Sequence, residues 1–141
     1  MQQSSLFFPV LALAAWTGLV LLLMPLRRIR AALRRAVSPD DFRLGESAHV
    51  PPHVSLVNRN YMNLLEAPML FYVVCILLFV TGGVSPGALG LAWAYVGLRV
   101  VHSLIHLSYN RVIHRLGVFA LSNGALVALW VIAGQHLLQM A

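Results

Sequence analysis

The chain has 141 residues, of which 60% are hydrophobic and 10% charged, with a formal net charge of +6. The length suits one domain, but an average soluble protein carries about 25% charged residues, so the composition indicates an integral membrane protein. All ten basic residues are arginines in two zones that each follow an apolar segment. A nucleic-acid-binding protein would instead need a soluble basic face, so we expect no nucleic-acid partner.

The first apolar segment, Leu6–Leu26, carries no charge over 21 residues and is long enough to cross one bilayer core. No lysine or arginine precedes it, which favours a membrane span over a signal peptide. The arginines that follow predict that the next residues stay cytoplasmic and that the N-terminus faces outward. We expect the helix to continue through Arg27–Arg35, and Ser38–Asp41 to form a turn before a loop that ends near Pro52.

Three further spans are expected, at residues 57–80, 88–107 and 116–138, after the first at 6–26. A glycine-rich turn without charge, residues 81–87, joins the second span to the third. The third and fourth are joined by a basic connection. Four spans place both basic connections on the cytoplasmic side, and both termini and the neutral turn outside. The predicted fold is an all-α membrane protein, one bundle of four transmembrane helices over residues 1–141.

Two polar stripes interrupt this apolar sequence, and the topology brings both near the cytoplasmic boundary. They are Arg59, Asn63 and Glu66 at the start of the second span, and Arg99, His102 and His106 at the end of the third. Spacings of three and four residues put the members of each stripe on one helical face. Charged groups inside a bilayer are costly and usually mark a site, so we expect the stripes to converge on one.

Several simpler interpretations of these residues are open. Glu66 could be neutralised by Arg59 and serve only helix packing, or it could be the essential glutamate of a small four-span multidrug exporter. His102 and His106 have a spacing that can bind a metal, but an arginine on the same face repels a cation, so we expect no metal. The single cysteine, Cys75, lies in apolar surroundings, which make a thiol unreactive.

An anion or zwitterion site fits the set best. Arginine forks pair with carboxylates bidentately and stay charged when partly desolvated. Arg99, Arg111 and Arg115 supply such guanidinium groups at one membrane boundary. Arg30 can approach from the first helix. Glu66 and Asn63 supply acceptors for an ammonium or an amide. The constellation therefore suits a small zwitterion with several carboxylates, held at the membrane edge.

On these residues the chain resembles the membrane-associated proteins in eicosanoid and glutathione metabolism, the MAPEG family, which includes microsomal glutathione transferases and microsomal prostaglandin E synthase. The resemblance extends from about residue 6 to residue 134. Its most specific element is Arg-x3-Asn-x2-Glu followed closely by proline, here Pro68. The third-span Arg-x2-His and the arginine after the next loop, Arg115, also match, and Arg30–Asp41 is similar to the family's first cytoplasmic segment.

The resemblance implies a homotrimer of four-helix subunits with glutathione, the co-substrate, bound between neighbouring subunits on the cytoplasmic side. It implies a transferase or peroxidase whose lipophilic electrophile arrives through the bilayer. Arg115 matches the catalytic arginine proposed to stabilise the glutathione thiolate. By matched position or membership of the second stripe, the expected glutathione-binding residues are Arg30, Arg59, Asn63, Glu66, Arg99, His102 and His106.

The chain departs from the eicosanoid enzymes at two positions. His106 stands where they have a tyrosine, and Leu116 follows Arg115 where they have a hydroxyl residue. Both changes remove groups that could bond the thiol. The departures resemble a bacterial branch of the family, as does the use of arginine without lysine, so we expect a bacterial inner membrane. A non-catalytic family member that binds a small anionic ligand or a partner is the alternative.

Overall fold

The computed structural model describes residues 2–140, and the regular elements in that range are helices together with one isolated bridge between Arg43 and Gly45. In chain order the elements are η1 Gln3–Leu6, α1 Phe7–Leu33, η2 Pro39–Phe42, α2 Pro52–Leu65, α3 Ala67–Val80, α4 Pro86–Leu107 and α5 Val112–Met140. Four helical segments are long and apolar enough to cross a membrane, with α2 and α3 together forming the second. The predicted all-α fold with four spans is confirmed.

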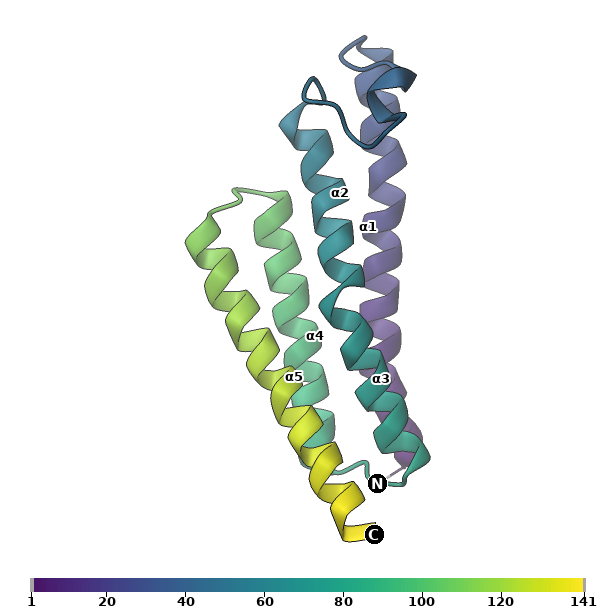
Figure 1. The fold of residues 1–141 in the computed structure, drawn as a ribbon, viewed down its shortest axis with the longest axis vertical. Helices are drawn as coiled ribbons and strands as arrows, with labels where there is room; N and C mark the ends of the chain where they lie inside the picture. Colours follow the sequence, from purple (N-terminus) through teal and green to yellow (C-terminus); the bar gives the residue numbers. More distant parts are fainter. Residues whose placement is uncertain (1, 141) are drawn as a thin grey trace.

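The bundle consists of two arms that meet at one end and separate toward the other (Figure 1). One arm contains α1 and the α2–α3 pair, and the other contains α4 and α5, which pack along each other. The turn between α3 and α4 lies at the same end as both chain termini, while the connections after α1 and α4 lie at the opposite end. The arginine-bearing connections therefore share one end of the molecule, as the sequence predicts.

The second span is broken at Glu66, where the backbone has ψ −89° between α2 and α3. Pro68 explains the break, because proline has no N–H to donate and its ring clashes with the carbonyl four residues earlier. The last turn of α2 therefore has carbonyl groups without partners inside the helix. The sequence pattern alone suggested an unbroken helical face through this region.

The connection after α1 is ordered by side-chain contacts. Ser38 and Asp41 form the predicted turn, in which the Ser38 N–H donates to Asp41 Oδ2 over 2.7 Å. Ser47 Oγ donates to the other carboxylate oxygen over 2.6 Å. Arg28 ties the loop to α1, because its guanidinium pairs with Glu46 at 3.1 Å and lies 4.5 Å from the centre of the Phe42 ring.

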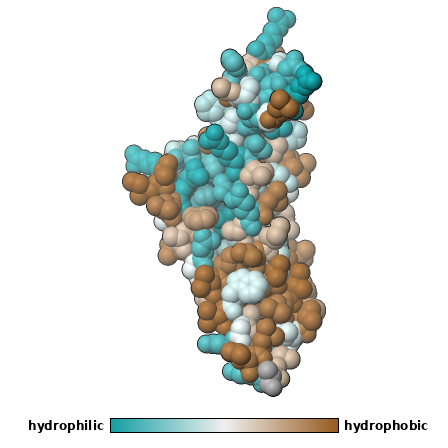
Figure 2. Space-filling view, viewed as in Figure 1, coloured by the Kyte–Doolittle hydropathy of each residue, from teal (hydrophilic) through white to brown (hydrophobic). Residues whose placement is uncertain are grey.

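The core fills the end where the arms meet. Phe71 of α3 and Tyr95 of α4 are fully buried and stack with ring centroids 4.6 Å apart, next to Leu13 of α1 and Leu129 of α5. On the face seen in Figure 2, this end is largely hydrophobic, whereas hydrophilic residues gather between the arms and at the opposite end. This face is therefore apolar over the core and polar in the cleft between the arms.

Candidate functional site

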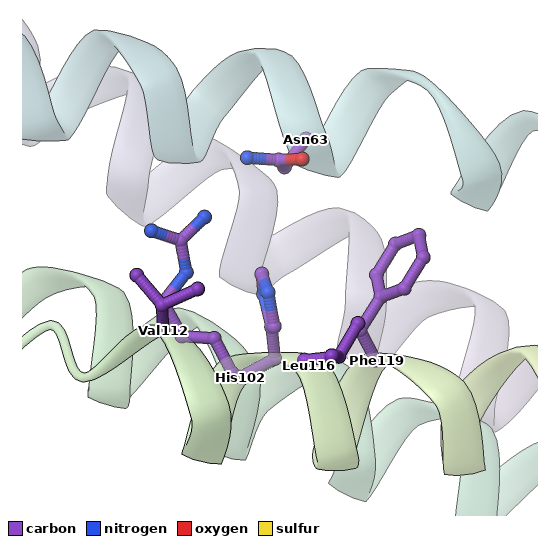
Figure 3. Close-up of a pocket in the computed structure, with 6 residues that line it drawn as sticks. Asn63, His102, Val112, Leu116 and Phe119 are labelled. Atoms are coloured by element: carbon purple, nitrogen blue, oxygen red, sulfur yellow. The ribbon is translucent and has the colours of Figure 1, made fainter.

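The polar region between the arms contains two adjoining cavities. The first has a volume of about 430 Å³ and is lined by Asn63, His102, Val112, Arg115, Leu116 and Phe119 (Figure 3). The second has a volume of about 340 Å³ and is lined by Leu56, Asn58, Arg59, Met62, Asn63, Glu66, His106, Asn110 and Arg115. Asn63 and Arg115 line both cavities. These two residues therefore mark the boundary between the two cavities. Half of the side chains that line the first are apolar, and we call it the apolar cavity; most of those that line the second are polar, and we call it the polar cavity.

The stripe on α2 faces the polar cavity. Arg59 and Glu66 are exposed, Asn63 is half-buried, and the amide nitrogen of Asn63 donates to the Arg59 carbonyl over 2.9 Å. Within residues 2–140, the single ion pair within 4 Å joins Arg28 to Glu46. Glu66 thus forms no ion pair with Arg59, and both charged groups are available to a ligand.

The stripe on α4 is buried. His102 is 3% exposed and His106 is 1% exposed, and their ring centroids lie 6.0 Å apart in an edge-to-face arrangement. His102 lines the apolar cavity beside Phe119 (ring centroids 5.9 Å apart), whereas His106 lines the polar one. In the described part of the chain, no group of three His, Cys, Asp or Glu residues is arranged to hold a metal.

Arg99 lies behind the cavities and lines neither of them. Its side chain is fully buried, Nη2 donates to the Asn63 main-chain carbonyl, and the guanidinium lies 5.6 Å from the centre of the Phe119 ring. The break at Glu66 explains this contact, because the Asn63 carbonyl belongs to the unpaired last turn of α2. Arg99 therefore caps the broken helix and contacts two residues that line the cavities, Asn63 and Phe119.

Arg30 is not brought together with the other predicted site residues in this subunit. It lines a separate cavity of about 300 Å³ with Arg27, Arg34 and His53, near the end of α1. A ligand in the cleft between the arms would have to extend into this separate cavity to reach Arg30.

Two polar contacts near the cleft were absent from the sequence analysis. Asn110 Oδ1 accepts a hydrogen bond from Arg115 Nη1 over 2.8 Å, and buried Asn60 donates to Ser103 Oγ over 2.6 Å, joining α2 to α4. Asparagine after a helix end is typical of the left-handed backbone conformation, so the sequence could have identified the backbone role of Asn110. Its side-chain partner depends on how α5 leaves the loop.

The sequence profile of the MAPEG family matches residues 7–135, which is nearly the whole chain. No curated protein and no solved structure matches the chain. The chain therefore belongs to the MAPEG family, which includes glutathione transferases among other membrane proteins. Together with the four apolar helices, this membership makes it an integral, multi-pass membrane protein.

Proposed function

We propose that this member of the MAPEG family is a glutathione-dependent transferase or peroxidase acting on lipophilic electrophiles. One observation carries the proposal. Arg115 lines both the polar and the apolar cavity, so a thiol held beside its guanidinium would meet a substrate that enters from the apolar side.

The polar cavity has the groups that glutathione requires. Glutathione carries two carboxylates, an ammonium and two amides, and the exposed guanidinium of Arg59 suits a carboxylate. The Glu66 carboxylate suits the ammonium, and Asn63 suits an amide. His102 and His106 add ring nitrogens at the cavity walls. In the proposed homotrimer, Arg30 of a neighbouring subunit would supply a further guanidinium for a glutathione carboxylate.

The apolar cavity suits a lipophilic second substrate. Val112, Leu116 and Phe119 line it, and its volume of about 430 Å³ lies within the range usual for small-molecule sites. Val112 is 71% exposed and Leu116 is 64% exposed at the surface of the bundle. Exposed apolar side chains beside this cavity would offer a hydrophobic molecule a route toward Arg115.

The proposed chemistry begins with the thiol. A free thiol has a pKa near 8.5, and a guanidinium within about 4–6 Å lowers a pKa by roughly two units. At pH 7 the thiolate fraction would rise from about 3% to about three quarters. The thiol proton goes to solvent in the polar cavity.

The thiolate sulfur then forms a bond to the electrophilic carbon, and the leaving group departs with its electron pair. With a hydroperoxide, the thiolate sulfur forms a bond to the terminal peroxide oxygen and the O–O bond breaks. The departing alkoxide takes a proton from solvent, which yields an alcohol and the sulfenic acid of glutathione. A second glutathione converts that acid to glutathione disulfide and water. Arg115 acts in both reactions by stabilising the anionic sulfur before attack.

The test is the ultraviolet absorbance of thiolate when glutathione is added to purified protein. We expect a thiolate signal with the wild type and none with Arg115→Ala. Arg111→Ala is the matched control, because Arg111 is exposed in the same connection and lines neither cavity. Absence of both a thiolate signal and calorimetric binding would refute the proposal. Binding without turnover over a panel of electrophiles and hydroperoxides would favour the non-catalytic alternative.

The proposed assembly and location follow from the same family membership. We propose a homotrimer in a bacterial inner membrane, with residues 1–141 as one domain, both termini outside and the basic connections cytoplasmic. Native mass measurement tests the trimer. Reporter fusions at the C-terminus and in the loop at 43–47 test the orientation, and we expect these two positions to report opposite sides of the membrane.

A further inference from the structure

We propose that Asn110 is a positioning residue for Arg115. The amide oxygen of Asn110 accepts a hydrogen bond from the guanidinium and so holds it at the boundary of the two cavities. Because the amide is neutral, the positive charge of Arg115 stays available to an anionic ligand sulfur. The inference rests on the proposed function and deepens it, because it identifies what orients the catalytic arginine.

The backbone of Asn110 is held in place by the end of α4. Its φ of 50° lies in the left-handed region, and its N–H donates to the Ile105 carbonyl over 2.8 Å. This bond reaches back five residues and ties the loop to the last turn of α4. Asparagine is one of the few residues other than glycine that adopt this conformation readily. The side chain of Asn110 therefore starts from a fixed direction.

Arg115 lies on the first turns of α5, where its N–H donates to the Arg111 carbonyl over 3.1 Å. Its side chain is half-buried, and Nη1 donates to Asn110 Oδ1 over 2.8 Å. Nε is buried and has no hydrogen-bond partner among the described residues. One edge of the guanidinium is thus held by the loop, while the group lines both cavities. The contact selects one orientation of a long side chain that would otherwise have several.

The neutrality of the acceptor matters as much as its position. The ion pair within the described residues lies elsewhere, between Arg28 and Glu46, so no carboxylate of these residues lies within 4 Å of the Arg115 guanidinium. The other charged or titratable groups that share a cavity with Arg115 are Arg59 and Glu66 from α2 and His102 and His106 from α4. An amide oxygen orients the guanidinium and leaves its positive charge available to a thiolate, whereas a carboxylate would neutralise that charge.

The variants Asn110→Asp and Asn110→Gly separate charge from orientation. Aspartate has the same size, tolerates the left-handed backbone and keeps the hydrogen bond, but it forms an ion pair with Arg115. Glycine suits the backbone best and removes the tether. A role confined to loop structure predicts little change in either variant, because both residues fit the φ of Asn110.

The experiment titrates the thiolate absorbance of bound glutathione against pH in the full-length protein. We expect Asn110→Asp to raise the apparent thiol pKa by about one unit, which is a tenfold loss of thiolate at pH values well below that pKa. We expect Asn110→Gly to produce a smaller rise, with thermal stability close to wild type in both variants. Ser108→Asp, which adds the same charge to an exposed position in the same loop, should shift the pKa by less than half of the Asn110→Asp shift.

The outcomes separate the two proposals. A wild-type thiolate signal that neither Asn110 variant changes would overturn the positioning role and leave the proposed function standing. Equal shifts from Asn110→Asp and Ser108→Asp would also overturn it, because they would show a general effect of loop charge. Wild-type protein without bound glutathione would overturn the proposed function, and the role of Asn110 with it.

Discussion

Gly83 in the turn between α3 and α4 offers a sharp test of how α5 is fixed. A Cβ atom at this position would lie 2.5 Å from Cδ2 of His136 and 2.9 Å from its Nε2. The same Nε2 lies 3.0 Å from the Thr81 carbonyl oxygen. Gly83→Ala must therefore push the His136 ring away and break its contact with the turn. This contact fastens α5 at the end opposite to Arg115.

The expected cost follows from these contacts. Loss of one hydrogen bond costs a net of about 0.5–1.5 kcal/mol, and an added methyl group in a packed position costs about 1–3 kcal/mol. Both effects come from one displaced ring, so they are not summed. We expect Gly83→Ala to lower the free energy of unfolding by about 1–3 kcal/mol. In a His136→Ala background the obstructing ring is gone, and the same change should cost less than about 0.5 kcal/mol.

The measurement is reversible unfolding by sodium dodecyl sulfate in detergent micelles, applied to the two single variants and the double variant. Gly90→Ala is the matched control, because a Cβ at Gly90 would meet nothing within 4 Å. The reasoning fails if Gly83→Ala is as stable as Gly90→Ala. It fails equally if Gly83→Ala costs the same with and without His136, because the clash would then not be the cause.

Two further predictions concern the loop after α1 and the contact between α2 and α4. Hydrogen bonds from Ser47 and Ser38 hold the pKa of the Asp41 carboxyl below its usual range, so their stabilisation is present above the unfolded pKa near 4 and is lost as pH falls through the lower folded pKa. In the wild type, hydrogen exchange should show protection of the Ser47 amide that declines only at acidic pH. In Asp41→Asn, this protection should already be weak near neutral pH. A wild-type exchange profile in Asp41→Asn would contradict the prediction. Asn60→Ala and Ser103→Ala should show a coupling of about 0.6 kcal/mol, and at most about 1.7 kcal/mol, in a double-mutant cycle of unfolding free energies. Strictly additive effects would mean that the 2.6 Å contact contributes nothing.

Much of the fold could be predicted from local sequence. A charge-free run such as Leu6–Leu26 has one low-energy state in a bilayer, a helix across it, because every backbone polar group must be paired internally. The four spans and the shared end of the arginine-bearing connections follow from run length and charge alone. The turn at Ser38–Asp41 was also predictable, since proline and short acidic side chains act on their immediate neighbours.

Part of the candidate site could be predicted in the same way. Helical periodicity placed Arg59, Asn63 and Glu66 together, and these residues do line one cavity with His106 and Arg115. The chemistry assigned to them remains a prediction that glutathione titration can test. Periodicity cannot reveal how deeply a side chain is buried, however. It made the buried Arg99 and the exposed Arg59 look equivalent.

The remaining features were decided by tertiary structure. Pro68 breaks the second span, but only the packing of α4 places Arg99 where it can donate to the Asn63 carbonyl. Likewise, Asn60 of α2 meets Ser103 of α4, 43 residues later in the chain, only because these two helices pack together. Run length, charge and periodicity express interactions between near neighbours in the chain, and these determined the class, the spans and the stripes. Which buried donor meets which acceptor depends on how separate helices pack, and no local pattern contains that information.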